Sequence, residues 1–206
     1  MSTTIDDSAL LIAGRGNVLV CDVGEAPPTL AELLAYASSN YGDAIEGFTT
    51  IGHTSPTDLP EWDSDGGDSE TKRTWEKENV YEKVDPVTNW FTVKALQFDN
   101  YVMSLREGGG TATTANTFAS PTTRSAIEKG ALIVYIKGGE VIGEYVPRVS
   151  IRGDGSIAHD VDEFSEIPLR FTQLSAPSGM SPHYWIGSKF GSTAAARPWA
   201  PATTTP

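Results

Sequence analysis

Short runs in which apolar and polar residues alternate, separated by Gly, Pro and Asp, dominate the chain. A period of two is typical of half-buried β-strands, and the separating residues favour turns. The pattern predicts strands at residues 17–22, 48–54, 69–80, 90–98, 131–137, 140–150 and 163–174. Gly138 and Gly139 join two of these runs, and such a connection favours a tight hairpin because glycine accepts positive φ angles.

Two segments follow the helical period instead. Thr29 is a candidate N-cap, and Glu32 completes a capping box for a helix predicted over residues 30–38. Asp99 is the candidate N-cap of a short second helix that ends at Gly108 and the two glycines after it. The chain as a whole is therefore β-rich.

Two other segments have compositions that argue against packed structure. Residues 54–68 contain two prolines and no basic residue, and their acidic residues are Asp58, Glu61, Asp63, Asp65 and Asp68. We predict a long, solvated acidic loop there. Residues 191–206 consist mainly of Ala, Thr and Pro with a single Trp199, too little apolar surface to offset the entropy lost on ordering. We predict that this segment is disordered.

Composition and charge exclude several classes of protein. The 206 residues carry 27 acidic and 15 basic side chains, so the formal net charge is −12. A surface that binds the nucleic acid backbone needs clustered Lys and Arg, which this balance argues against. A chain of this length is about one domain and needs no metal or disulfide to fold. Its single cysteine, Cys21, cannot pair within the chain, so a reducing compartment or indifference to redox conditions is the default expectation.

Membrane and export signals are not found in the sequence. No apolar run approaches the roughly eighteen residues of a membrane span, and the amino terminus is acidic where a secretory signal is basic. We expect no membrane anchor, and we expect the protein to stay in the compartment where it is made.

Candidate catalytic residues are few, and the sequence around them lacks the motifs of known catalytic sites. His53, Ser55 and Asp58 supply the residue types of a hydrolytic triad, but no nucleophile-elbow motif surrounds the serine. The other histidines, His159 and His183, share no ligand spacing with His53 or with the cysteine, so a transition-metal site is not expected. We predict no catalytic residue and no enzymatic activity.

Ligand-binding motifs are equally incomplete. Asp63, Asp65 and Asp68 place oxygen ligands as in half of a calcium loop, without flanking helices or the closing glutamate. Gly14-Arg15-Gly16 precedes its strand rather than following it, so it is no dinucleotide fingerprint. The adhesion-type tripeptide Arg152-Gly153-Asp154 is too short to carry weight. We interpret both tripeptides as turns, and we predict no metal or cofactor.

Four tryptophans leave one alternative function open. On a β-sandwich, exposed indoles stack sugars, which would make the protein a carbohydrate-binding or adhesion module. We favour burial of these indoles in the core or in an interface. The residues concerned are Trp62, Trp75, Trp90 and Trp185. A β-rich chain with an acidic surface, long loops and extended ends otherwise suits a self-assembling structural protein whose sheets join edge to edge.

Several short sequence motifs, in a fixed order across residues 17–174, resemble those of a known protein family. The first are Ile51-Gly52-His53-Thr54-Ser55, Asp58-Leu59-Pro60-Glu61, Asp65-Gly66-Gly67-Asp68, Glu70-Thr71 and Trp75. The later ones are Phe91-Thr92-Val93, Leu96-Gln97-Phe98-Asp99, Ala131-Leu132-Ile133-Val134-Tyr135, Ile167-Pro168-Leu169 and Phe171. Together they resemble the major tail tube proteins of long-tailed (siphovirus) bacteriophages that infect actinobacteria.

The resemblance implies a mainly β fold, a β-sandwich or open barrel with one flanking α-helix. It implies an N-terminal arm at residues 1–16 that reaches an adjacent ring, a tail tube domain at 17–176 and a C-terminal extension at 177–206. Residues 54–68 would then brace contacts between rings. The extension is too short for the appended immunoglobulin-like module of longer relatives.

The same resemblance implies a structural virion protein. Six copies form a ring, rings stack into the tail tube, and the tube is the conduit for genome ejection. The implied partners are a tape-measure protein, a baseplate-proximal initiator and a tail terminator, with DNA passing transiently through the lumen. The protein would be assembled in the host cytoplasm. Six copies would carry a formal charge of −72, and an acidic lumen would keep DNA from adhering.

Overall fold

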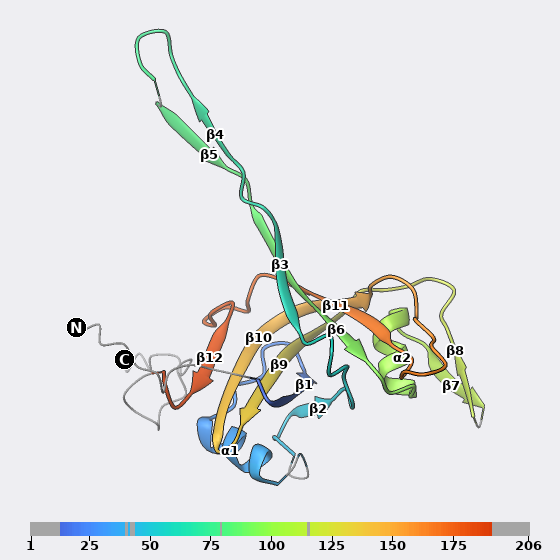
Figure 1. The fold of residues 1–206 in the computed structure, drawn as a ribbon. Coiled ribbons are helices and arrows are strands. Elements are labelled where there is room, and N and C mark those ends of the chain that lie inside the picture. The colour runs from blue at the N-terminus through green and yellow to red at the C-terminus, as the bar shows by residue number, and fades with distance from the viewer. Residues whose placement is uncertain (1–12, 40, 42–43, 79, 115, 191–206) are drawn as a thin grey trace, which may run out of the picture.

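The computed structural model describes residues 13–39, 41, 44–78, 80–114 and 116–190. Its body is one antiparallel sheet with the strand order β2-β1-β9-β10-β11-β6-β3, and β12 pairs with β10 (Figure 1). These strands are β1 (Arg15–Cys21), β2 (Phe48–Thr50), β3 (Glu61–Gly66), β6 (Val87–Ala95), β9 (Ile127–Lys137), β10 (Glu140–Gly153), β11 (Ile167–Gln173) and β12 (Tyr184–Gly187). Two smaller hairpins are β4 (Ser69–Lys72) with β5 (Tyr81–Val84) and β7 (Thr111–Thr114) with β8 (Thr117–Ala119). The prediction of a mainly β protein is confirmed.

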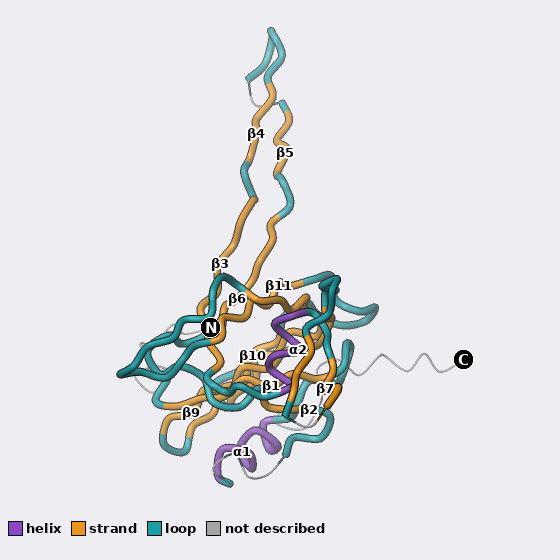
Figure 2. The backbone as a smooth tube through the Cα atoms, turned by 90° about the vertical axis from the view of Figure 1, so that its right-hand side faces the viewer, coloured by secondary structure: helices purple, strands orange, loops and turns teal. Residues whose placement is uncertain are grey.

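Two helices flank the sheet where the resemblance implies one. They are α1 (Leu30–Ser38), at one end of the body, and α2 (Asn100–Glu107), against the sheet (Figure 2). At the start of α1, the Thr29 amide donates to Glu32 Oε2 at 2.6 Å, and the Glu32 amide donates to Thr29 Oγ1 at 3.3 Å. This reciprocal pair is the predicted capping box, which satisfies two amides that the first turn leaves without partners. Neither helix is long and apolar enough to cross a membrane.

The ends of α2 also follow the prediction. The Val102 amide donates to the Asp99 carboxylate at 2.8 Å, which caps the helix. Gly108 ends it with a φ of 71°, a left-handed conformation that favours glycine. Local capping signals therefore set the bounds of both helices.

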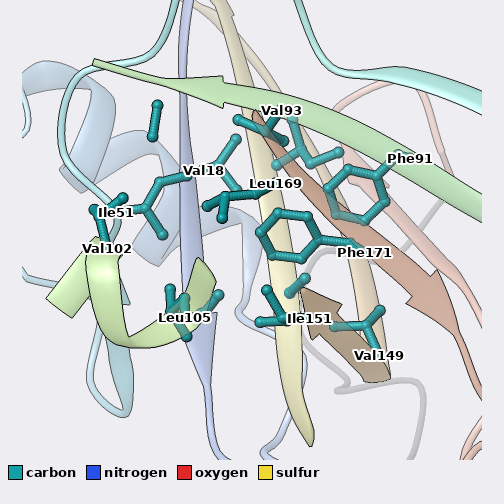
Figure 3. Close-up of a cluster of buried hydrophobic side chains, with 14 of the residues drawn as sticks. Val18, Ile51, Phe91, Val93, Val102, Leu105, Val149, Ile151, Leu169 and Phe171 are labelled. Carbon is teal, nitrogen blue, oxygen red and sulfur yellow. The ribbon is translucent and has the colours of Figure 1, made fainter. Parts of the chain in front are cut away.

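The sheet is packed on both faces. Because side chains alternate along a strand, Val18 of β1 points into one buried cluster while its neighbour Leu19 points into the other. Figure 3 shows the first cluster, to which α2 contributes Val102 and Leu105. Leu33 of α1 lies in the second cluster. Each helix thus covers a different apolar face.

β10 changes partner halfway along its length. A bulge lies between Val146 and Val149, with β12 paired before it and β11 paired after it. Pro147, inside the bulge, has no amide hydrogen to give to the sheet. β12 lies within residues 177–206, so part of the expected C-terminal extension pairs with the sheet.

The prediction of a loop over residues 54–68 is wrong from Glu61 onward. Residues 61–66 form β3, which pairs with β6. The β4–β5 pair extends this two-stranded ribbon outward. We call residues 61–92 the projecting hairpin, because it extends far beyond the body in both views (Figures 1 and 2). Its carboxylates stay in water while β6 satisfies its backbone, so a high acidic content is compatible with a strand here.

Three predicted strands are too long. The strand predicted at 48–54 ends at Thr50, shortly before Gly52 with its φ of 85°. The strand predicted at 69–80 ends at Lys72, where the turn of the projecting hairpin begins. The strand predicted at 163–174 starts only at Ile167, after a loop. In each case a turn interrupts an alternating pattern.

The two tripeptides interpreted as turns lie largely in strands instead. Arg15 and Gly16 begin β1, and Arg152 and Gly153 end β10. A Cβ at Gly16 would lie 2.5 Å from the Val134 carbonyl oxygen, so the glycine permits close approach of two backbones. The predictions for residues 1–12 of the N-terminal arm and for residues 191–206 concern segments outside the described residues.

Cys21 is expected to resist thiol reagents in the folded protein. It is 4% exposed, and its Sγ lies 3.9 Å from the Tyr145 hydroxyl. Burial raises the pKa of this thiol to about 12, so little thiolate exists near pH 8. Titration with a thiol reagent should detect no fast reaction in buffer and one thiol per chain in denaturant. Fast labelling of the native protein would show that the second cluster opens readily.

Candidate assembly site

The projecting hairpin exposes apolar side chains that a single chain does not cover. Trp75, near its tip, is 100% exposed. Tyr81, Val84 and Val87 on its strands are each more than half exposed. A two-stranded hairpin is marginally stable alone in water, and exposed apolar patches mark interaction surfaces. The hairpin is therefore built to be covered by another surface.

Charge divides the projecting hairpin into two parts. Its first strand is acidic, with Glu61, Asp63, Asp65, Asp68 and Glu70. Its turn at residues 72–77 has mixed charge, with Lys72, Arg73 and Lys77 on either side of the exposed indole and Glu76 next to it, a formal net charge of +2. An ion pair at this turn joins Lys72 Nζ to Glu70 Oε2 at 3.8 Å between solvent-exposed side chains, a type of pair that stabilises little. The turn is thus a small net-positive segment, with Glu70 before it and Glu78 after it, on an acidic chain.

A column of stacked rings anchors the base of the projecting hairpin. Trp62 of β3 lies 4.9 Å from Phe91 of β6 and 5.1 Å from the imidazole of His183, measured between ring centroids. Phe91 stacks on Phe171 at 4.6 Å, and His183 stacks on Trp185 at 5.2 Å. The column runs from the fully buried phenylalanines to the half-exposed Trp185. It joins the hairpin to β11 on one side and to β12 on the other.

A buried carboxylate fixes the imidazole of this column. Glu144 of β10 is 1% exposed, and its Oε2 accepts a hydrogen bond from the Tyr135 hydroxyl at 3.0 Å. Its Oε1 lies 3.0 Å from His183 Nε2, close enough for an ion pair although the two atoms are not well directed for a hydrogen bond. Burying a carboxylate is costly unless it is paired. Glu144 is therefore held between the Tyr135 hydroxyl and the imidazole of the column.

Replacing His183 by alanine is expected to lower the free energy of unfolding by about 2 kcal/mol. This is less than for a fully buried pair, because a quarter of the His183 side chain is exposed. The substitution leaves the buried Glu144 carboxylate without its imidazole partner, so adding Glu144→Gln should recover part of the loss. Denaturant unfolding followed by tryptophan fluorescence measures both. Equal stability of the single and double variants would contradict the pairing.

A lysine ties the segment before the hairpin to the sheet. Lys94 Nζ lies 2.8 Å from Asp58 Oδ2 and 2.8 Å from Glu166 Oε2. Hydrogen bonds to Asp58 and then to Glu166 raise the pKa of this lysine. Since Lys94 is on β6, residues 54–60 are held against the strand that carries the hairpin back to the body.

The candidate triad residues are engaged elsewhere. Asp58 pairs with Lys94 rather than with His53. Ser55 is 3% exposed, and its hydroxyl lies 3.0 Å from the Thr57 hydroxyl. These contacts do not form a relay from a carboxylate through an imidazole to a serine.

The candidate calcium ligands act within their own strand. Asp63 accepts a hydrogen bond from the Ser64 amide at 2.8 Å, and Asp65 accepts one from the Gly66 amide at 3.0 Å. Within the described parts of the chain, no three His, Cys, Asp or Glu side chains gather as a metal site would require. The two aspartates are therefore solvated strand residues.

The four tryptophans do not form a shared sugar platform. Trp62 and Trp185 stack on opposite sides of His183, so each has a ring face occupied. The Arg170 guanidinium lies 3.8 Å over the Trp90 ring. Trp75 stands apart at the tip of the hairpin. The predicted role of these indoles in a core or interface agrees with this arrangement better than sugar stacking does.

Three strands of the main sheet have an open edge. Among the described strands, β2 pairs only with β1, β3 pairs only with β6, and β12 pairs only with β10. Unpaired edges present amides and carbonyls that another chain can use. Sequence reasoning missed β12 altogether, because its four residues follow a segment rich in Ser, Pro and Gly.

Comparison with known proteins agrees with a role in assembly. The chain matches the phage tail tube protein family over residues 3–197. It is 33% identical over 185 residues to the major tail protein Gp23 of Mycobacterium phage D29, an alignment that covers 88% of this chain and 92% of that protein. It is 32% identical, with the same coverage, to the major tail protein Gp23 of Mycobacterium phage L5. The chain therefore belongs to the phage tail tube protein family, which makes it a structural protein of the virion tail.

Proposed function

We propose that six copies of this chain close into a ring, that rings stack into the tail tube, and that the tube conducts the genome into the host. The observation that carries the proposal is the projecting hairpin. Its exposed indole and aliphatic side chains stand away from its own body, where only another subunit can cover them. Ordering such a surface in the free chain has no benefit unless assembly buries it.

Ring closure uses the open edges of the sheet. An edge of one subunit pairs with an edge of the next, so that no edge remains free once the ring is complete. Closure makes assembly cooperative, because the last subunit gains two interfaces at once. This explains how an acidic chain avoids random association and still forms a regular tube.

The charge of the chain suits a conduit for DNA. Six chains of −12 carry −72, and the part of this charge that faces the lumen repels phosphate and keeps DNA mobile. A reconstruction of the assembled tube tests this placement. Carboxylates are expected to outnumber cations on the inner wall, and a cationic wall would contradict the proposal.

The remaining parts of the chain have proposed roles in the same assembly. Residues 1–16 form an arm to an adjacent ring, 17–176 the tube domain and 177–206 an extension. Residues 54–60 and the projecting hairpin, rather than a loop at 54–68, stabilise the contacts between rings. A tape-measure protein, a tail-tip initiator and a terminator set the length and the ends of the tube. Assembly takes place in the host cytoplasm.

Negative-stain electron microscopy of the purified chain, with and without tail-tip complexes, tests the proposal. Tubes with six-fold end views are expected, at least when tail tips supply a nucleus. Chains that never add to tail tips would contradict it. Glycan binding with a dissociation constant tighter than about 1 mM by such chains would favour the carbohydrate-binding alternative.

A further inference from the structure

Three large apolar side chains are exposed more than any others that the structure describes. Trp75 is 100% exposed, Val161 is 98% exposed and Phe164 is 80% exposed. The first is at the tip of the projecting hairpin, and the other two share the loop between β10 and β11. Exposed apolar groups at two separate sites of one chain are expected where copies of the chain meet.

Internal hydrogen bonds and a ring contact order the loop at residues 158–166, which carries two of these apolar side chains. Its ends are joined by two backbone hydrogen bonds between Ala158 and Glu166, at 3.1 and 3.0 Å. His159 Nδ1 lies 2.9 Å from the Ser165 hydroxyl, and the imidazole stacks on Phe98 at 6.0 Å. These contacts close the loop against the body. Exposure of its apolar residues is therefore a feature of an ordered surface.

The turn of the hairpin is ordered as well. The Thr74 amide donates to the Lys77 carbonyl at 2.9 Å, and the Lys77 amide donates to the Thr74 hydroxyl at 3.2 Å. The Val80 amide donates to the Lys72 carbonyl at 2.9 Å. A turn with internal hydrogen bonds loses less conformational entropy on docking than a flexible one does.

The two apolar sites carry opposite charges. The loop supplies carboxylates immediately beside its apolar residues, and the hairpin turn supplies cations beside its indole. The carboxylates are Asp160, Asp162 and Glu163, and the cations are Lys72, Arg73 and Lys77, which outnumber the one carboxylate of the turn, Glu76. Complementary charge of this kind speeds association and fixes register, and it acts against wrong partners.

The hairpin is too long for its tip to contact the 158–166 loop of the same chain. Nine residue steps separate Gly66 from Trp75, and at about 3.3 Å per residue they span roughly 30 Å. Both views place the tip far from the body, whereas the 158–166 loop is part of the body (Figures 1 and 2). A contact between the tip and this loop therefore requires two different chains.

We propose, resting on the tube assembly proposed above, that the hairpin turn at residues 72–77 docks onto the 158–166 loop of another subunit. Trp75 packs against Val161 and Phe164, while the cations face the carboxylates of the loop. The contact joins two different surfaces, so it repeats from subunit to subunit rather than closing a pair. It assigns both the turn and the loop to one interface.

Double charge reversals test this pairing. Arg73→Glu with Lys77→Glu, or Asp162→Lys with Glu163→Lys, should each slow tube growth on tail-tip complexes by about tenfold or more. Combining all four substitutions in one chain should restore growth, because both partners are then inverted. Lys137→Glu with Arg152→Glu, at exposed positions of β9 and β10, which are not edge strands, is the matched control and should grow normally.

The outcomes separate this pairing from the tube proposal. If the unmodified chain forms no tubes, the tube proposal fails. If it forms tubes and the combined variant grows no better than the single reversals, the pairing is wrong. A chain with Trp75→Cys and Phe164→Cys gives a second readout, because Cys21 is buried. Oxidised tubes should contain disulfide-linked ladders of subunits, and ladders that do not form in intact tubes would overturn the pairing.

Discussion

Replacing Phe91 by alanine is expected to lower the free energy of unfolding by about 4 kcal/mol. The ring is 0% exposed and lies between Phe171 at 4.6 Å and Trp62 at 4.9 Å. Removing it leaves a cavity in the column that joins the hairpin to the sheet. Denaturant unfolding followed by circular dichroism gives the free energy.

The matched control for this substitution is Phe164→Ala. Phe164 is 80% exposed in the single chain, so its loss should change the free energy of unfolding by no more than about 0.5 kcal/mol. The same variant should grow tubes poorly if the loop is an interface. A cost below about 1 kcal/mol for Phe91→Ala would mean that the ring column does not hold the hairpin base.

Shortening the projecting hairpin is expected to abolish tubes and to leave the monomer folded. Residues 67–86 are replaced by an Asn-Gly turn, which joins Gly66 to Val87 where these residues already pair. The removed strands β4 and β5 are exposed throughout, so their loss removes almost no core. Thermal unfolding and negative-stain microscopy report the two effects separately.

Glu82→Gln is the control for the shortened chain. It keeps the full hairpin and changes one exposed side chain, so tubes should form as in the unmodified protein. If the shortened chain still formed tubes at the unmodified yield, the hairpin would have no part in assembly. If it failed to fold, the hairpin would belong to the folding core, contrary to its exposure.

Elements with local signals could be predicted from the sequence. The capping box at Thr29 and the cap at Asp99 act within one turn of helix, so both helices follow from a few neighbouring residues. The Gly138-Gly139 connection likewise predicts the β9–β10 hairpin. The order of short sequence motifs indicated the tail tube family, and the family match and the two mycobacteriophage relatives confirm it.

The first strand of the projecting hairpin could not be predicted from the local pattern. Residues 61–65 are Glu-Trp-Asp-Ser-Asp, and with Trp62 as the one apolar residue among them no apolar-polar alternation marks a strand. Five acidic residues without a cation suggested a loop instead. Solvation on both faces of an extended two-stranded hairpin removes that conflict, because no carboxylate has to be buried.

The order of the strands could not be predicted from local pattern. β11 lies between β10 and β6, and β1 lies beside β9, pairings that join residues far apart in the chain. The contact between His183 and Glu144 could not be predicted either. The two residues are 39 positions apart and meet only because β12 pairs with β10. Such contacts depend on the assembled sheet and leave no local signature.

A cryo-electron microscopy reconstruction of the assembled tube is the most direct test of the central claim, that this chain builds stacked six-membered rings joined through the projecting hairpin. Six subunits per ring are expected, with each hairpin leaving its own subunit to contact another one. A tube with a different ring symmetry, or with each hairpin folded back on its own subunit, would contradict it.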